Sequence, residues 1–210
     1  MTHSLHRKGN KDNLCDDYVM LIMPGVTRMK LPAVQKSMKE IWEILSRYET
    51  ALVNFGTLRG GGRHKKTIEE FKNNPLMIVH AVFKEREALK ACLKEIKEKD
   101  FGVSVSVSGL YEEVKKTCSE IGLSPHTVQV SLGISGKTDK LPENDVLEIS
   151  TMCGHAMVSP NLIVHLIERI NKGRMTHGEA ARELTAMCDC GIFNPHRAEN
   201  LLRKMTGVTS

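Results

Sequence analysis

Three cysteines and a histidine lie in two short loops in the C-terminal third of the chain, within the sequences TMCGHAMVSP and CDCGIFNP. Cys153, His155, Cys188 and Cys190 give the pattern C-x-H, thirty-two intervening residues, and C-x-C. Thiolates and imidazoles are the preferred ligands of zinc, and thiolates also hold iron–sulfur clusters. These residue types predict a metal site if the fold brings the two loops together.

The elements around the loops favour such a meeting. The two helices expected between the loops are short, so they can fold back as an antiparallel pair and return the chain near its start. Each loop precedes a predicted helix N-terminus, at Ser159 and Asn194, where the helix dipole favours negative charge and helps to keep thiols deprotonated. Glycines follow Cys153 and Cys190 directly and let backbone amides approach the sulfur atoms.

Four interpretations of these residues compete. The first is an iron–sulfur cluster held by the three cysteines, with the remaining iron bound by His155 or left open. The second is a Cys3His zinc site, although C-x-C with C-x-H departs from the C-x2-C spacing of zinc fingers. The third is thiol chemistry, with Cys188 and Cys190 as a dithiol and Cys153 as a nucleophile beside His155. The fourth is plain packing, because free cysteine is often buried. We expect the cluster, with zinc as the alternative cofactor.

A second candidate site is the basic, glycine-rich segment RGGGRHKK, which follows a predicted strand and precedes a helix with a capping box at Thr67 and Glu70. Glycines free backbone amides, and a helix N-terminus attracts anions, so this segment predicts an anion-binding loop. Neither common nucleotide-binding glycine motif is present. A basic surface loop without a ligand is the alternative. The proposed anion-binding residues are Arg59, Gly60, Gly61, Gly62, Arg63, His64, Lys65 and Lys66.

Apolar and amphipathic stretches alternate along the first two thirds of the chain. This alternation predicts an α/β fold with a mostly parallel sheet, and a ferredoxin-like β-α-β arrangement within residues 76–134 is the alternative. In a parallel sheet the loops after the strands share one edge, where they would surround a cleft. The expected strands are 18–23, 51–56, 75–83, 101–109 and 126–134, and the expected helices between them are 31–48, 84–100 and 110–122.

The predicted domain organisation has three parts. Residues 1–16 read as a flexible tail, residues 17–145 as the α/β domain, and residues 146–210 as a helical metal-binding unit. That unit is expected to begin with a short strand at 146–150 and to continue with three helices. The expected helices are 159–173, 176–187 and 194–205.

Composition limits the classes of partner. The net charge of +5 is concentrated in the first residues and in the 59–66 segment, and aromatic residues make up only 4% of the chain, which argues against a nucleic-acid surface. No apolar run is long enough for a signal peptide or a membrane span, so we expect a cytoplasmic protein without a membrane partner. Self-association into a homo-oligomer stays open.

Taken together, these features predict an iron–sulfur enzyme that acts on an anionic small molecule by lyase, dehydratase or sulfur-transfer chemistry. The sequence does not identify a catalytic residue, although His155 and His64 are candidates. The alternative is a non-catalytic module, stapled by zinc or a cluster, that binds a ligand or regulates a partner.

Overall fold

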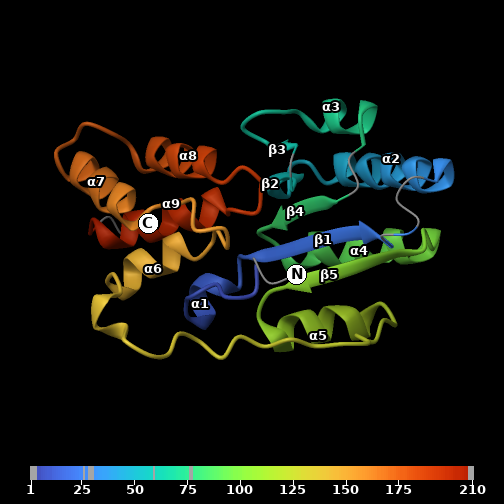
Figure 1. The fold of residues 1–210 in the computed structure, drawn as a ribbon, viewed down its shortest axis with the longest axis horizontal. Helices are drawn as coiled ribbons and strands as arrows, with labels where there is room; N and C mark the ends of the chain where they lie inside the picture. The colour runs from blue at the N-terminus through green and yellow to red at the C-terminus, as the bar shows by residue number, and fades with distance from the viewer. Residues whose placement is uncertain (1–3, 26, 28–30, 59, 76–77, 208–210) are drawn as a thin grey trace.

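The computed structural model describes residues 4–25, 27, 31–58, 60–75 and 78–207. Figure 1 shows a β-sheet with its helices in one half of the molecule and a helical unit in the other. The strands are β1 (Tyr18–Pro24), β2 (Leu52–Thr57), β3 (Gly61–Gly62), β4 (Val79–Phe83) and β5 (Val103–Ser108). Their order across the sheet is β3-β2-β4-β1-β5.

Every strand pairing in this sheet is antiparallel, so the prediction of a mostly parallel sheet was wrong. The helical crossover from β1 leads to β2, and the crossover from β4 leads to β5, but each crossover skips one position in the sheet. The two pairs therefore interleave, and neighbouring strands run in opposite directions. Alternation of strands and helices in the sequence does not distinguish this arrangement from a parallel one.

Two further expectations about the sheet are not confirmed. The ferredoxin-like arrangement proposed for 76–134 is not confirmed, because residues 127–134 form no strand. The loops after the strands do not share one edge either, since the end of β1 at Pro24 pairs with the start of β5 at Val103. The cleft expected at a common edge therefore has no basis in this topology.

Helices α2 (Pro32–Arg47), α3 (Ile68–Asn73), α4 (Arg86–Lys99) and α5 (Tyr111–Glu120) accompany the sheet. Their apolar faces share a core with alternate residues of β1, including Tyr18, Met20 and Ile22. Trp42 of α2 is fully buried there and stacks on Phe71 of α3 at 4.7 Å between ring centroids. This aromatic contact fixes α3 and the segment before it against the sheet.

The helical unit contains α6 (Asn144–Ser150), α7 (Pro160–Asn171), α8 (His177–Met187) and α9 (Pro195–Met205). The last three lie where the sequence predicts helices, whereas α6 replaces the short strand expected at 146–150. The buried residues of this unit form one core with Val19, Leu21 and Val82 of the sheet. Both faces of β1 are therefore buried, which explains why its sequence is apolar along its whole length.

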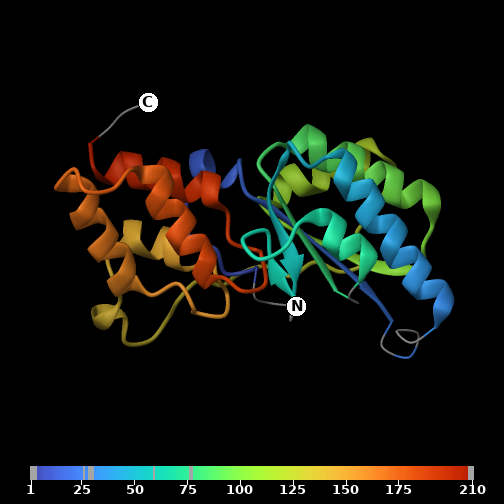
Figure 2. The same cartoon turned by 90° about the horizontal axis from the view of Figure 1, so that it is seen from above.

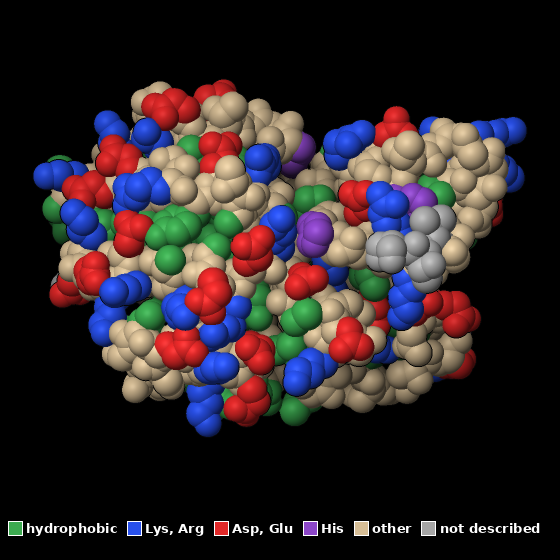
Figure 3. Space-filling model, turned by 180° about the vertical axis from the view of Figure 1, so that it is seen from behind, with side chains coloured by type: hydrophobic (Ala, Val, Ile, Leu, Met, Phe, Trp, Pro, Cys, Tyr) green, Lys and Arg blue, Asp and Glu red, His purple; other side chains and the backbone are tan. Residues whose placement is uncertain are grey.

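The remaining described segments are short or extended. Helix α1 (Lys11–Leu14) follows the first described residues, and the chain between α5 and α6 has no helix or strand apart from a helical turn at Thr138–Lys140. No helix among the described residues is long and apolar enough to cross a membrane. On the face seen in Figure 3, basic and acidic side chains are interspersed, and neither sign gathers into a broad patch.

Candidate metal centre

The two cysteine loops meet where the helical unit touches the sheet. The first loop joins α6 to α7 and contains Cys153 and His155, and the second joins α8 to α9 and contains Cys188 and Cys190. Helix α8 begins at the predicted capping box of Thr176. Figure 2 shows the second loop reaching the hairpin formed by β2 and β3.

The four residues singled out by the sequence form a connected row. The Sγ atoms of Cys188 and Cys190 are 3.9 Å apart, and the Sγ of Cys190 is 3.6 Å from Nδ1 of His155. Cys153 lies beside Cys188 and interacts electrostatically with it. The three cysteines are at most 2% exposed, whereas His155 is exposed. The row therefore has a buried thiol end and an imidazole end that faces solvent.

Hydrogen bonds along this row shift the pKa values of the three cysteines in different directions. The pKa of Cys190 is lowered, because it accepts hydrogen bonds from the Cys188 thiol and from the backbone N–H of Ile192. The pKa of Cys153 is raised by its hydrogen bond to Cys188 and by burial. For Cys188 the bond from Cys153 lowers the pKa, but the bond to Cys190 and burial outweigh it and raise the pKa to about 11. Negative charge is thus favoured on Cys190 first.

The four side chains of the row are not arranged as the ligands of a metal ion. Within the part of the chain that the structure describes, no group of three or more His, Cys, Asp and Glu side chains is arranged to hold a metal ion as it stands. Neighbours in the row are close to one another, but the four side chains do not surround one common point. Metal binding therefore requires some of them to turn.

Glycines allow the second cysteine loop to lie directly on the β2–β3 hairpin. Gly191 has a φ of +74°, and a Cβ added there would stand 2.2 Å from the carbonyl oxygen of Phe55. A Cβ on Gly56 would stand 2.8 Å from the carbonyl oxygen of Cys190, and one on Gly62 would stand 2.9 Å from Gly191 Cα. Only residues without a side chain permit this backbone contact. Part of the predicted anion-binding segment is therefore a packing surface for the cysteine loop.

The basic side chains of that segment have partners within the protein. Arg63 donates from Nη1 to the carbonyl oxygen of Leu52 at 2.6 Å, and its guanidinium lies 5.5 Å from the ring centroid of Phe55. Lys65 forms an ion pair with Asp189, the residue between Cys188 and Cys190.

The other predicted members of the segment differ in their surroundings. Lys66 lies over the ring of Phe71 at 5.6 Å, and the pKa of His64 is lowered by burial and by the neighbouring Lys65. Gly60 forms a turn before β3, and Arg59 lies outside the described residues.

Two polar side chains of the sheet donate hydrogen bonds to backbone carbonyls of the second cysteine loop. His80 of β4, fully buried, donates from Nδ1 to the carbonyl oxygen of Cys190 at 2.7 Å. Asn54 of β2 donates from Nδ2 to the carbonyl oxygen of Phe193 at 2.8 Å. The sequence marks both residues only as polar positions inside apolar strands, and it does not indicate which distant backbone they contact.

An arginine near the N-terminus joins the two cysteine loops. Arg7 donates from Nη2 to the carbonyl oxygen of Met152 at 3.2 Å and also to that of Ile192. Met152 precedes Cys153, and Ile192 lies two residues after Cys190, so one guanidinium contacts both loops. Sequence reasoning assigned this segment to a flexible tail, and no local pattern points to the contact.

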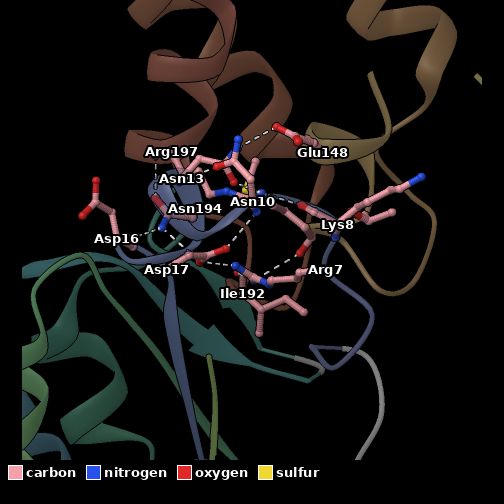
Figure 4. A network of polar contacts seen from close by, with 12 residues as sticks. Arg7, Lys8, Asn10, Asn13, Asp16, Asp17, Glu148, Ile192, Asn194 and Arg197 are labelled. Atoms are coloured by element: carbon pink, nitrogen blue, oxygen red, sulfur yellow. Dashed lines mark hydrogen bonds and ion pairs between the residues drawn. The ribbon is translucent and has the colours of Figure 1, made fainter. Parts of the chain in front are cut away.

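Arg7 belongs to a buried polar network that Figure 4 shows. Asp17 is fully buried and forms ion pairs with Arg7 and with Nη1 of Arg197, the latter at 3.1 Å. Asn194 donates from Nδ2 to Asp17 at 3.0 Å, and its Oδ1 accepts the backbone N–H of Arg197 at 2.9 Å. The cap of α9, the start of β1 and the N-terminal segment are therefore held by one carboxylate.

Comparisons with protein-family models, with curated proteins and with solved structures found no match.

Proposed function

We propose that this chain is a metal-binding protein in which Cys153, Cys188, Cys190 and His155 bind a single metal ion, with zinc as the favoured metal. The distances within the row carry the proposal. Ligands around a tetrahedral zinc ion, with Zn–S near 2.3 Å and Zn–N near 2.0–2.1 Å, stand about 3.8 Å apart for two sulfurs and about 3.5 Å apart for sulfur and nitrogen. The separations in this chain are 3.9 Å and 3.6 Å.

Occupation of the site needs side-chain rotation and deprotonation. Cys190 is the first ligand, because its pKa is already lowered. Cys153 and Cys188 would have to lose their protons on binding, and a nearby cation would lower their pKa values. His155 would supply the ligand on the solvent-exposed side of the site. The resulting centre would join the loop before α7 to the loop before α9.

An iron–sulfur cluster on the same three cysteines is the second candidate. The exposed position of His155 favours it, because this side of the site is open to an exchangeable ligand. Close thiols argue against it, since the cysteines of a four-iron cluster bind different iron atoms and are spread further apart than ligands of one ion. The enzymatic role expected from the sequence belongs to this candidate, with an anionic substrate near His64 and Lys65 of the adjacent hairpin.

Metal analysis of protein purified without oxygen tests the proposal. We expect about one zinc per chain and a colourless protein, whereas about three to four irons with broad absorbance near 400 nm would establish the cluster instead. Single Cys→Ser variants at 153, 188 and 190 should each lose the metal. Cys118→Ser, in the half-buried part of α5, is the matched control and should retain it. Metal-free wild-type protein after growth with zinc and iron would contradict both candidates.

A further inference from the structure

A segment without helix or strand between α5 and α6 exposes a row of apolar side chains. Residues 127–134 alternate polar and apolar positions, as a strand does, yet they belong to no strand. Val128, Val130 and Leu132 share one side of this pattern and are 50%, 63% and 94% exposed. Gly133 has a φ of +79°, outside the strand region, so the regular alternation ends there, and Ile134 beyond it is 50% exposed. Isolated apolar residues on a surface are ordinary, but three at alternate positions are typical of a surface that is covered in an assembly.

The backbone of this segment is also unpaired. Among the described residues, no backbone–backbone hydrogen bond joins residues 125–135 to another part of the chain. A hydrogen bond links the segment to the N-terminal residues, with Nδ1 of His6 2.9 Å from Oγ of Ser131. The segment therefore has the alternation of a strand and free backbone groups, but no neighbouring strand in its own chain.

Strand β5 supplies a matching edge. It is the last strand of the described sheet, and its valines at 103, 105 and 107 pack partly buried toward the core, while the intervening residues are serines. Neither β5 nor residues 127–134 contains a charged side chain or a proline. Exposed edge strands are normally guarded by charges or prolines, because an unguarded edge pairs with other chains. The composition of both segments is that of paired strands.

Helix α5, which follows β5 in the chain, also buries few of its residues. Thr117 is the one fully buried residue of α5, whereas α4 buries Leu89, Cys92, Leu93 and Ile96. A strand added outside β5 would lie next to the valine face of β5 and extend the apolar layer toward α5. Residues 127–134 have the alternation that such a strand needs.

We propose that two copies of the chain form a twofold-symmetric dimer, in which residues 127–134 of each copy add as a strand to β5 of the other. A second copy is the matching occupant, because it presents both halves of the contact, an unpaired apolar strand and an unguarded sheet edge. The two contacts are then equivalent, as twofold symmetry requires. Main-chain hydrogen bonds supply the pairing, and the apolar side chains of 127–134 continue the valine face of β5.

Sedimentation velocity over a range of protein concentrations tests this dimer. Leu132→Lys should raise the dimer dissociation constant at least about tenfold, because it replaces an apolar contact by a charge in each of two equivalent contacts. Val164→Lys is the matched control, since Val164 of α7 is 46% exposed and lies in the helical unit; it should leave the constant unchanged. A monomer at every concentration, or equal effects of the two substitutions, overturns the proposal.

Hydrogen exchange of the wild-type protein tests the pairing without any substitution. Backbone amides of 103–108 and of 127–134 should both gain protection as concentration rises through the dimerisation range. Protection of 127–134 alone would mean that the two segments pair with each other, which contradicts the addition to β5. A dimer in which neither region gains protection also contradicts it.

Discussion

Substitution of Gly191 by alanine should be among the most damaging single changes in this protein. The residue has a φ of +74°, and a new Cβ would stand 2.2 Å from the carbonyl oxygen and 2.6 Å from the carbonyl carbon of Phe55. These atoms belong to β2, which lies between β3 and β4 and cannot shift without disturbing both pairings. The cysteine loop must move instead.

The size of the effect can be divided into two parts with a matched control. Gly173 also has a positive φ, +65°, but nothing lies within 4 Å of its added Cβ, so Gly173→Ala reports the backbone conformation alone and should cost about 1 kcal/mol. Gly191→Ala adds the displacement of the loop. That displacement breaks the hydrogen bonds from His80 and Asn54 to loop carbonyls, at about 1–3 kcal/mol for each buried group left unsatisfied. We expect a total of about 3–5 kcal/mol.

Urea unfolding followed by circular dichroism measures both variants against the wild type. Since small domains have about 5–15 kcal/mol of stability, Gly191→Ala should lower the midpoint far more than Gly173→Ala, and it should abolish metal binding if the proposed centre exists. Equal losses of stability in the two variants would refute the close packing of the cysteine loop on β2, because only that packing distinguishes them.

Three smaller predictions address other contacts. Arg7→Met should cost about 2–4 kcal/mol in the same unfolding assay, because it removes a buried ion pair and leaves two loop carbonyls without this donor; a loss under about 0.5 kcal/mol would contradict the joining role. Asp189→Asn should change stability by less than about 1 kcal/mol, since its ion pair with Lys65 is solvent-exposed on both sides. The pKa of Glu179 is lowered by hydrogen bonds from the backbone N–H and hydroxyl of Thr176, so its contribution to stability is present above the unfolded pKa of about 4.3 and is lost as pH falls through the folded pKa. Unfolding midpoints measured against pH should therefore show wild type and Glu179→Gln converging in acid, and a constant gap would contradict the assignment.

The sequence predicts the local parts of this structure better than their arrangement. Capping boxes at Thr67 and Thr176 and the asparagine cap at Asn194 have the predicted hydrogen bonds, because each depends on residues three positions apart. The direction of the sheet was predicted wrongly, because it depends on which strands become neighbours. The pattern of residues 126–134 has the alternation of a strand, yet a strand also needs a partner, and the described chain supplies none to this segment.

The meeting of the two cysteine loops was within reach of sequence reasoning, but the contacts that hold them were not. Short helices between the loops suggested that Cys153 and Cys190 would approach each other, whereas Arg7 and His80 reach the loops across more than a hundred residues of sequence. Hydrogen bonds to backbone carbonyls leave little trace in the sequence, because any residue provides the carbonyl. Such partners become visible only when the fold is known.

Burial alone does not explain the chemistry of the cysteine row. Cys92, packed in the sheet core, has a pKa raised by burial, as expected of a cysteine that serves as a small apolar side chain. Cys190 is also nearly inaccessible, yet its pKa is lowered, since a neighbouring thiol and a backbone N–H donate to its sulfur. The two buried cysteines therefore differ in the hydrogen bonds offered to their sulfur atoms and not in their burial. Such donors favour a thiolate, which is the form that a metal ion and thiol chemistry both require.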